Sequence, residues 1–242
     1  MERYAGSPIN AWPSFADLML SVVLVLVTIL VVAVVFITTG ADYGAVELRQ
    51  EAIRERIEQA RGEVFTDPED GSRVYVMSDG GETEIRVIES DGESRITFGD
   101  RLLFDRGEPN LSETGRALIA EIGKTISPEL EYIREVQIHG HTDPSYDTEV
   151  YESDQEGYQY NLNLGSQRAA DVFQQLQAVG VNPVTNLMSI ASYGPYRPVN
   201  RSDNADYDAE RLAEDNTGDL AEQNRRIELL LHFNPPPDAV EP

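Results

Sequence analysis

The hydrophobic pattern of the chain begins with one long apolar run. Residues 18–41 carry no charged side chain, and most of them are Val, Leu or Ile. About twenty apolar residues suffice for a helix to cross the hydrocarbon core of a bilayer, whereas the apolar core of a cleavable signal peptide typically spans about 7–15 residues. We therefore predict a retained transmembrane helix over residues 12–39, preceded by a short stub of residues 1–11.

A heptad-like pattern follows this run. Between residues 40 and 66 the apolar side chains have a spacing close to that of a coiled coil. They are Val46, Ile53, Ile57, Ala60 and Val64, with Gln50 as one polar interruption. This spacing predicts a helical linker over residues 40–66. Two arrangements are compatible with it. The stripe packs on the chain's own next domain, or it pairs with a second copy in a short coiled coil, which would make the protein a homodimer.

Short runs of strand-forming residues come next. They cover residues 72–78, 83–89 and 93–99, and the sequences SDGGE and SDGE between them are typical of turns. This pattern predicts a short β segment over residues 67–98.

Helical and strand-like patterns then alternate along the chain. Helices are predicted at 110–126, where Ser112 precedes the periodic apolar positions, and at 163–180, where Gly180 ends the helix. Strands are predicted at 134–143, 187–194 and 225–233. The inward stripe of the second helix is predicted to be Leu164, Ala169, Val172 and Leu176. This order predicts an α/β sandwich over residues 99–234, with helices on one face of a mixed sheet. Two acidic stretches, 143–160 and 201–223, are predicted to be solvated loops, and residues 235–242 a disordered tail.

The charge balance limits the partners and the orientation. The chain has 43 acidic and 19 basic side chains, a formal net charge of -24, which argues against binding to nucleic acid. Arg3 and the amino terminus precede the apolar run, while Asp42 and Glu47 follow it. The positive-inside rule then places residues 1–11 in the cytoplasm and everything after residue 40 outside it. The charge pattern therefore predicts a membrane protein whose carboxy-terminal part lies outside the cytoplasm.

The sequence HGHTD is a candidate start of a metal site. His139, His141 and Asp143 alternate, so in a strand their side chains share one face. The only other histidine is His232, and no Cys or Glu-x-x-His cluster completes a coordination sphere. An EF-hand loop starting at Asp206 also fails, because its sixth position is not glycine. We therefore expect no metal, no cofactor and no catalytic site.

Four sequence blocks, taken in order, resemble the OmpA-like peptidoglycan-binding domain. They are IHGHTD at 138–143, NLNLGSQRA at 161–169, SYGPYRPV at 192–199 and NRRIEL at 224–229. The resemblance implies that Asp143 and Arg168 hold the diaminopimelate of the wall peptide, supported by Asn161 and Thr142. The chain departs from the usual pattern in a gap about ten residues longer after HGHTD, and in Gly165 where Ser is usual.

The chemistry of this pair is consistent with such a ligand. Diaminopimelate is zwitterionic, so a guanidinium can take its carboxylate in a bidentate fashion while a carboxylate takes its ammonium. The alternative is an internal salt bridge between Asp143 and Arg168 that binds nothing. Arg225 and Arg226 are expected to brace the last strand or nearby carboxylates.

Asp17 stands at the start of the apolar run and has two interpretations. Ser14 and Asp17 have the spacing of a helix-capping box. However, the sequence WPSFADLML, followed by a span and an OmpA-like domain, is similar to MotB-type stator subunits, including those of Zorya systems, whose Asp is the ion carrier. With a helix starting near Pro13, Asp17 lies about 7 Å deeper than Trp12. A carboxylate there can take up and release a proton.

Together these features predict a single-pass inner-membrane protein anchored to peptidoglycan. The resemblance implies a wall-fixed, ion-conducting stator subunit that works as a homodimer with a multi-span partner of MotA type. The alternative is a passive tether between membrane and wall. Either proton or sodium, and either motility or defence, is compatible with the sequence.

Overall fold

The structure is a computed structural model of the whole chain, and it describes residues 12–61, 64–67, 73–77, 83–90, 92–201 and 207–234. The predicted stub 1–11 and the predicted tail 235–242 lie outside the described residues. The chain divides into two compact units, of which the first includes Met1–Ala45 and the second is Val46–Pro235.

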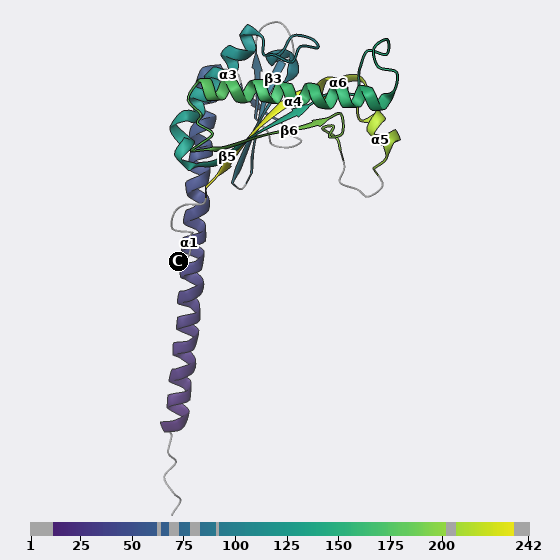
Figure 1. Cartoon of the computed structure of the whole chain (residues 1–242). Helices are drawn as coiled ribbons and strands as arrows, with labels where there is room; N and C mark the ends of the chain where they lie inside the picture. The colour runs from purple at the N-terminus through teal and green to yellow at the C-terminus, as the bar shows by residue number, and fades with distance from the viewer. Residues whose placement is uncertain are drawn as a thin grey trace, which may run out of the picture. The chain divides into compact units, whose positions relative to one another are not determined.

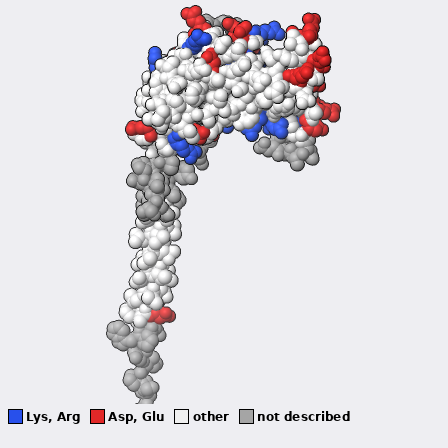
Figure 2. Space-filling view, in the orientation of Figure 1, with Lys and Arg blue, Asp and Glu red and all other residues white. Residues whose placement is uncertain are grey.

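The first unit contains most of the helix that starts the described chain. Helix α1 (Trp12–Arg61) is 50 residues long and extends into the second unit. Its Phe15–Val35 stretch has a mean hydropathy of 3.3 and none of it is buried, so α1 is long and apolar enough to cross a membrane. Asp17 is the one charged residue of this stretch, which is otherwise uncharged in Figure 2. The predicted span and residues 40–61 of the predicted linker therefore belong to one helix, whereas the linker prediction was wrong at Val64–Thr66, which form strand β1.

The second unit is built on a seven-stranded mixed sheet in the order β1-β2-β3-β4-β7-β5-β6. Its strands are β1 (Val64–Thr66), β2 (Arg73–Met77), β3 (Thr83–Ser90), β4 (Glu93–Gly99), β5 (Ile133–His141), β6 (Leu187–Gly194) and β7 (Arg226–Phe233). Only the β5–β6 pair is parallel among these neighbours. The predicted α/β fold with a mixed sheet is confirmed. The β segment predicted at 67–98 continues into this sheet, because β4 pairs directly with β7.

The helices of this unit agree with the sequence only in part. They are α2 (Asp100–Leu103), α3 (Glu113–Ile126), the 3₁₀ helix η1 (Ser127–Tyr132), α4 (Asp154–Ala178), α5 (Ala209–Glu214) and α6 (Gly218–Asn224). Ser112 caps α3 as predicted, since its Oγ accepts from the Gly115 N–H at 2.9 Å. The prediction of two acidic loops was wrong where α4 begins at Asp154 and where α5 and α6 form. Their Ser153 and Asp208 caps supply the acceptors that start α4 and α5.

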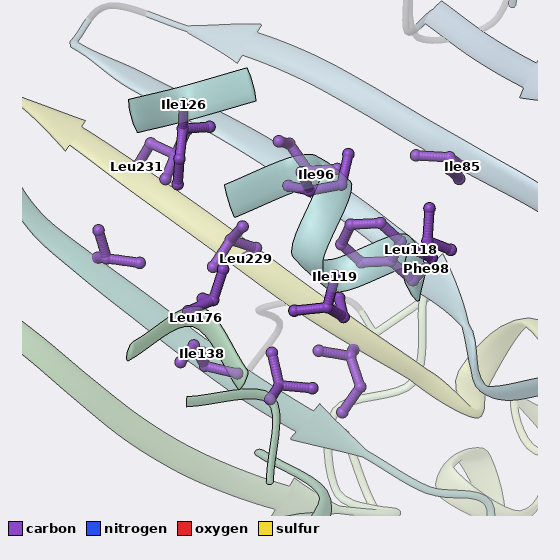
Figure 3. Packing of buried hydrophobic residues seen from close by; sticks show 14 of the residues in the cluster. Ile85, Ile96, Phe98, Leu118, Ile119, Ile126, Ile138, Leu176, Leu229 and Leu231 are labelled. Atoms are coloured by element: carbon purple, nitrogen blue, oxygen red, sulfur yellow. The ribbon is translucent and has the colours of Figure 1, made fainter. Parts of the chain in front are cut away.

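The core lies between the sheet and its helices (Figures 1 and 3). Strand residues such as Ile96, Phe98 and Leu229 meet helix residues such as Ile119, and all four are fully buried. The predicted stripe of α4 is buried as well; its members are Leu164, Ala169, Val172 and Leu176.

The linker part of α1 belongs to this same core. Ile53 and Ile57 are 2% and 1% exposed and lie in the domain's hydrophobic cluster. Gln50, the polar interruption of the stripe, donates its Nε2 to the carbonyls of Ser90 and Glu93 at 2.9 and 3.0 Å. Of the two arrangements compatible with the heptad-like spacing, the structure shows packing on the chain's own domain. The Ile53 and Ile57 side chains are therefore not available to a second copy.

Candidate functional site

The candidate site lies where β5 ends and the following loop begins. Asp143 is 5% exposed, and its Oδ1 accepts from the Ser145 N–H at 3.0 Å. Asn161 on α4 donates its Nδ2 to the Ser145 carbonyl at 2.9 Å. Asn161 thus supports the turn that orients the Asp143 carboxylate.

Thr142 precedes Asp143 and is 3% exposed. Its N–H donates to the Gly194 carbonyl at 3.0 Å, which ties the end of β5 to the end of β6. Within the described part of the chain, its Oγ1 has no hydrogen-bond partner. Thr142 therefore brings a polar atom to the site that the fold itself does not use.

Arg168 reaches the same region from α4. It is 3% exposed, its Nε donates to the Glu108 carbonyl at 3.0 Å, and its guanidinium lies 4.8 Å from the centre of the Phe104 ring. Its charged partner is Asp100 in α2, whose Oδ2 lies 3.3 Å from Nη1. The alternative of a salt bridge between Asp143 and Arg168 is not what the structure shows.

The partner of Asp143 is Arg225, the residue just before β7. Arg225 Nη1 donates to Asp143 Oδ2, and Arg225 Nε lies 3.7 Å from Asp100 Oδ2. The four side chains form a chain of alternating charge in the order Asp143, Arg225, Asp100, Arg168, which we call the charge network. The expectation that Arg225 braces nearby carboxylates is confirmed, and Arg226 donates likewise to Glu228 at 2.7 Å. Sequence reasoning missed Asp100, which lies outside the four motif blocks.

Burial and pairing oppose each other throughout the charge network. Burial raises the pKa of Asp100, although Arg168 and Arg225 act in the other direction. Burial also lowers the pKa of Arg168 against the pull of Asp100. For Arg225, burial works to lower the pKa, but the bond to Asp143 and the charge of Asp100 prevail and raise it. The network holds two acids and two bases, so its formal charge is balanced.

Access to the charge network differs between its members. The exposed fractions of the side chains are 3% for Arg168, 8% for Asp143, 13% for Asp100 and 26% for Arg225. Arg225 is thus the member in best contact with solvent. A ligand with an ammonium and a carboxylate can replace one internal pair here without leaving a charge unmatched.

Two glycines allow α4 to approach β5 closely enough to form the site. A Cβ on Gly140 would lie 2.1 Å from the Gly165 carbonyl oxygen, and a Cβ on Gly165 would lie 2.5 Å from Ser192 Oγ. Contacts this short do not occur between real side chains and backbone, so Gly140 cannot carry a side chain at this spacing. At Gly165, where Ser was expected, the constraint is weaker, because the nearest atom is the Ser192 side-chain hydroxyl and the Gly140 carbonyl oxygen would lie 3.3 Å away. This contact brings Asn161 and Arg168 to the end of β5.

The HGHTD histidines meet a third group that sequence reasoning missed. His139 and Glu228 are opposite each other in the β5–β7 pairing, and with His141 they place potential ligand atoms within 4.8 Å of one another. Arg226 already donates to Glu228 at 2.7 Å, and Arg95 Nε lies 4.0 Å from its other oxygen. Burial would raise the pKa of Glu228, but His141 and Arg226 outweigh it and lower that pKa. These two guanidinium groups already supply the positive charge beside Glu228 that a metal ion would otherwise bring. The cluster is therefore best explained as an ion-pair network of the sheet.

The fold and the charge network define a class of protein: an α/β binding domain that offers carboxylate and guanidinium groups to an ionic ligand. The OmpA family model matches residues 103–211, a range that includes Asp143, Asn161 and Arg168. The chain therefore contains an OmpA-family domain, as the motif blocks indicated. No curated protein matches the chain.

One solved structure with a TM-score above 0.5 shows the same fold, and two others are similar over a smaller share of this chain. A MotB-like protein from Desulfovibrio vulgaris is similar with a TM-score of 0.52 and 16% identity, covering 80% of this chain and 94% of that one. The periplasmic domain of Helicobacter pylori MotB, residues 78–256, has a TM-score of 0.47 and 20% identity, covering 66% and 88%. The cell wall anchor of the T6SS from Pseudomonas aeruginosa has a TM-score of 0.44 and 19% identity, covering 62% and 88%.

Proposed function

We propose that the chain is a single-pass inner-membrane protein whose periplasmic domain binds the diaminopimelate-containing peptide of peptidoglycan. The observation that carries this proposal is the buried charge network at the end of β5. Thr142 and Asn161 belong to the same proposed site, the first through its unused hydroxyl and the second through the turn it holds.

The ligand's chemistry matches the order of charges in the network. The free end of diaminopimelate carries an ammonium and a carboxylate on one carbon. Its ammonium can replace Arg225 at Asp143, and its carboxylate can then accept from the displaced Arg225 and from Arg168. Each exchange trades one charge-assisted hydrogen bond for another. Because three of the four side chains are at most 13% exposed, these bonds form where water screens them weakly.

The membrane segment supports a role beyond attachment. Asp17 is the sixth residue of α1, whereas the capping box of Ser14 and Asp17 requires a helix that begins at Phe15. Ser14 lies within α1 and not at its N-cap, which does not agree with a capping role. We extend the proposal accordingly: the chain is a wall-fixed stator subunit in which Asp17 carries the coupled ion beside a multi-span partner of MotA type. Two of the similar structures are described as MotB or MotB-like proteins, in keeping with this proposal.

A second copy of the chain is part of this proposal. Because Ile53 and Ile57 are buried in the chain's own core, a homodimer must use other residues. Leu48, which is 65% exposed on the same helix, is one apolar side chain still available for such a contact.

The test of peptidoglycan binding uses the full chain in detergent. Asp143→Ala and Arg168→Ala should each abolish sedimentation with purified peptidoglycan. Arg211→Ala is the matched control, because Arg211 is 56% exposed and its ion pairs with described residues are to Glu214 and Asp215, close to it in sequence. Circular dichroism melts report whether the variants are folded. Binding that survives in both folded site variants would refute the site assignment.

A further inference from the structure

An open hollow lies beside the first turns of α4, away from the charge network. Its lining residues are Val150, Tyr151, Glu156, Gln159, Tyr160 and Asn163. Five of them come from the acidic stretch between the first two motif blocks, which includes the extension of α4 that sequence reasoning missed, and Asn163 belongs to the second block. This segment is therefore a structured part of the surface with its own shape.

Aromatic rings form the base of this hollow. The Tyr151 and Tyr160 rings lie 5.0 Å apart at an interplanar angle of 31°, and Tyr146 meets Tyr151 edge-on at 6.3 Å. Gly157 allows this arrangement, because a Cβ there would lie 2.2 Å from the Tyr146 ring. The Tyr146 hydroxyl also donates to Asp154 in the first turn of α4. The rings are thus held by packing and by a hydrogen bond.

Polar side chains surround the rings. Glu156, Gln159 and Asn163 are spaced three and four residues apart on α4, so they lie on one side of the helix. Gln159 Nε2 donates to Asn163 Oδ1 at 3.3 Å. Amides and a carboxylate offer both donors and acceptors to a ligand. The hollow therefore combines flat apolar surface with a polar edge.

The charge around the hollow selects against anions. The stretch before and within the first turn of α4 carries Asp147, Glu149, Glu152 and Asp154, and Figure 2 shows acidic side chains gathered over this end of the domain. A phosphate, a nucleic acid or an acidic peptide would be repelled. An uncharged ligand with one apolar face and many hydroxyl or amide groups fits, and pyranose sugars have that character.

We propose that this hollow binds the N-acetylated amino sugars of the peptidoglycan glycan strand, next to the peptide site. The inference rests on the proposed function, because the sugars and the peptide belong to one polymer. Tyr160 and Arg168 are eight residues apart on α4, about 12 Å along the helix. Two extended peptide residues span about 7 Å. The diaminopimelate side chain and the lactyl group that joins the sugar to the peptide cover the remaining distance of about 5 Å, so a stem peptide with the free end of its diaminopimelate at the charge network can place its sugar at the hollow.

Two probes separate the sugar from the peptide. The first is N-acetylmuramyl-tripeptide ending in diaminopimelate, and the second is the same tripeptide without the sugar. Binding to the full chain in detergent is measured by calorimetry. We expect Tyr151→Ala and Tyr160→Ala to weaken the sugar-bearing probe about five- to tenfold and to leave the sugar-free probe unchanged. Tyr160→Phe, which keeps the ring, should retain most of the affinity.

Tyr158→Ala is the matched control, since Tyr158 lies on the same helix but contacts Tyr196 and does not line the hollow. Equal affinity of the wild type for both probes would overturn the inference, and so would equal weakening of both probes in the tyrosine variants. The trimer of N-acetylglucosamine tests the hollow independently of the peptide site. If Asp143→Ala leaves the sugar-free probe unaffected, the proposed peptide site fails, while loss of the trimer in Tyr160→Ala would still support the sugar site.

Discussion

Asp100 offers the sharpest test of the charge network, because it is the counter-ion shared by Arg168 and Arg225. Asp100→Asn keeps the size and the hydrogen-bond acceptor but removes the charge. Arg168, which is 3% exposed, then keeps only the Glu108 carbonyl and the Phe104 ring as contacts of full strength. Removing one partner of a buried ion pair typically costs about 3–5 kcal/mol. Because the amide oxygen remains, we expect a loss of about 2–3 kcal/mol.

The assay is a thermal melt of the full chain in detergent, followed by circular dichroism. For a domain of this size, 1 kcal/mol corresponds to roughly 2–4 °C, so the melting temperature should fall by about 5–10 °C. Asp105→Asn is the matched control, because Asp105 is exposed on the loop just after α2. An exposed substitution of this kind usually changes stability by less than about 0.5 kcal/mol.

Ligand binding should separate Asp100 from Asp143. In Asp100→Asn the Arg168 guanidinium has lost its anionic partner, and the ligand's carboxylate can supply one, so the ligand should raise the melting temperature more than it does in the wild type. In Asp143→Asn the ammonium loses its partner, and the ligand should no longer raise the melting temperature. Equal loss of ligand stabilisation in the two variants, or an unchanged melt for Asp100→Asn, would refute the reasoning.

Three further outcomes follow from other parts of the molecule. Asp17→Asn should insert into the membrane and bind peptidoglycan normally, but it should fail to complement the phenotype caused by deletion of the gene. Full complementation would favour a passive tether. Burial lowers the pKa of His139 to about 4, so between pH 6.5 and 4 the unfolded chain binds more protons than the folded chain. The free energy of unfolding therefore decreases as the pH is lowered through this range. Discounted for partial exposure, the loss of unfolding free energy between pH 7 and pH 5 is about 1 kcal/mol. His139→Asn should make this loss smaller, as measured by melts at the two pH values. Gly140→Ala forces Gly165 and the rest of α4 away from β5 and should cost about 1–3 kcal/mol in the same melt, whereas Gly99→Ala, which meets open space, should not.

Periodicity was sufficient to predict the elements that bury an apolar stripe. The second predicted helix was located by Leu164, Ala169, Val172 and Leu176, all of which are buried. Its first nine residues escaped prediction because residues 154–162 are polar and carry no such stripe. A signal was nevertheless present: Ser153 and Glu156 have capping-box spacing, and Ser153 Oγ accepts from the Glu156 N–H at 3.3 Å.

The partners within the candidate site could not be predicted from spacing. The motif blocks identified Asp143 and Arg168, but a sequence does not indicate which of several opposite charges each one meets. Asp100 lies in a four-residue helix with no motif around it, and Arg225 could equally have faced any carboxylate near the last strand. Only the folded sheet, which places β7 beside both β4 and β5, decides these pairs.

The central place of β7 has a consequence for how the protein reaches its folded state. The strand is the last of the described chain, yet it separates β4 from β5 in the sheet and contributes Leu229 and Leu231 to the core. The two halves of the sheet therefore stay unjoined until β7 has been synthesised. Pairings between residues so far apart in sequence form slowly. Since Arg225 arrives with β7, an unfinished chain lacks one member of the charge network, and only a completely folded molecule presents the whole site.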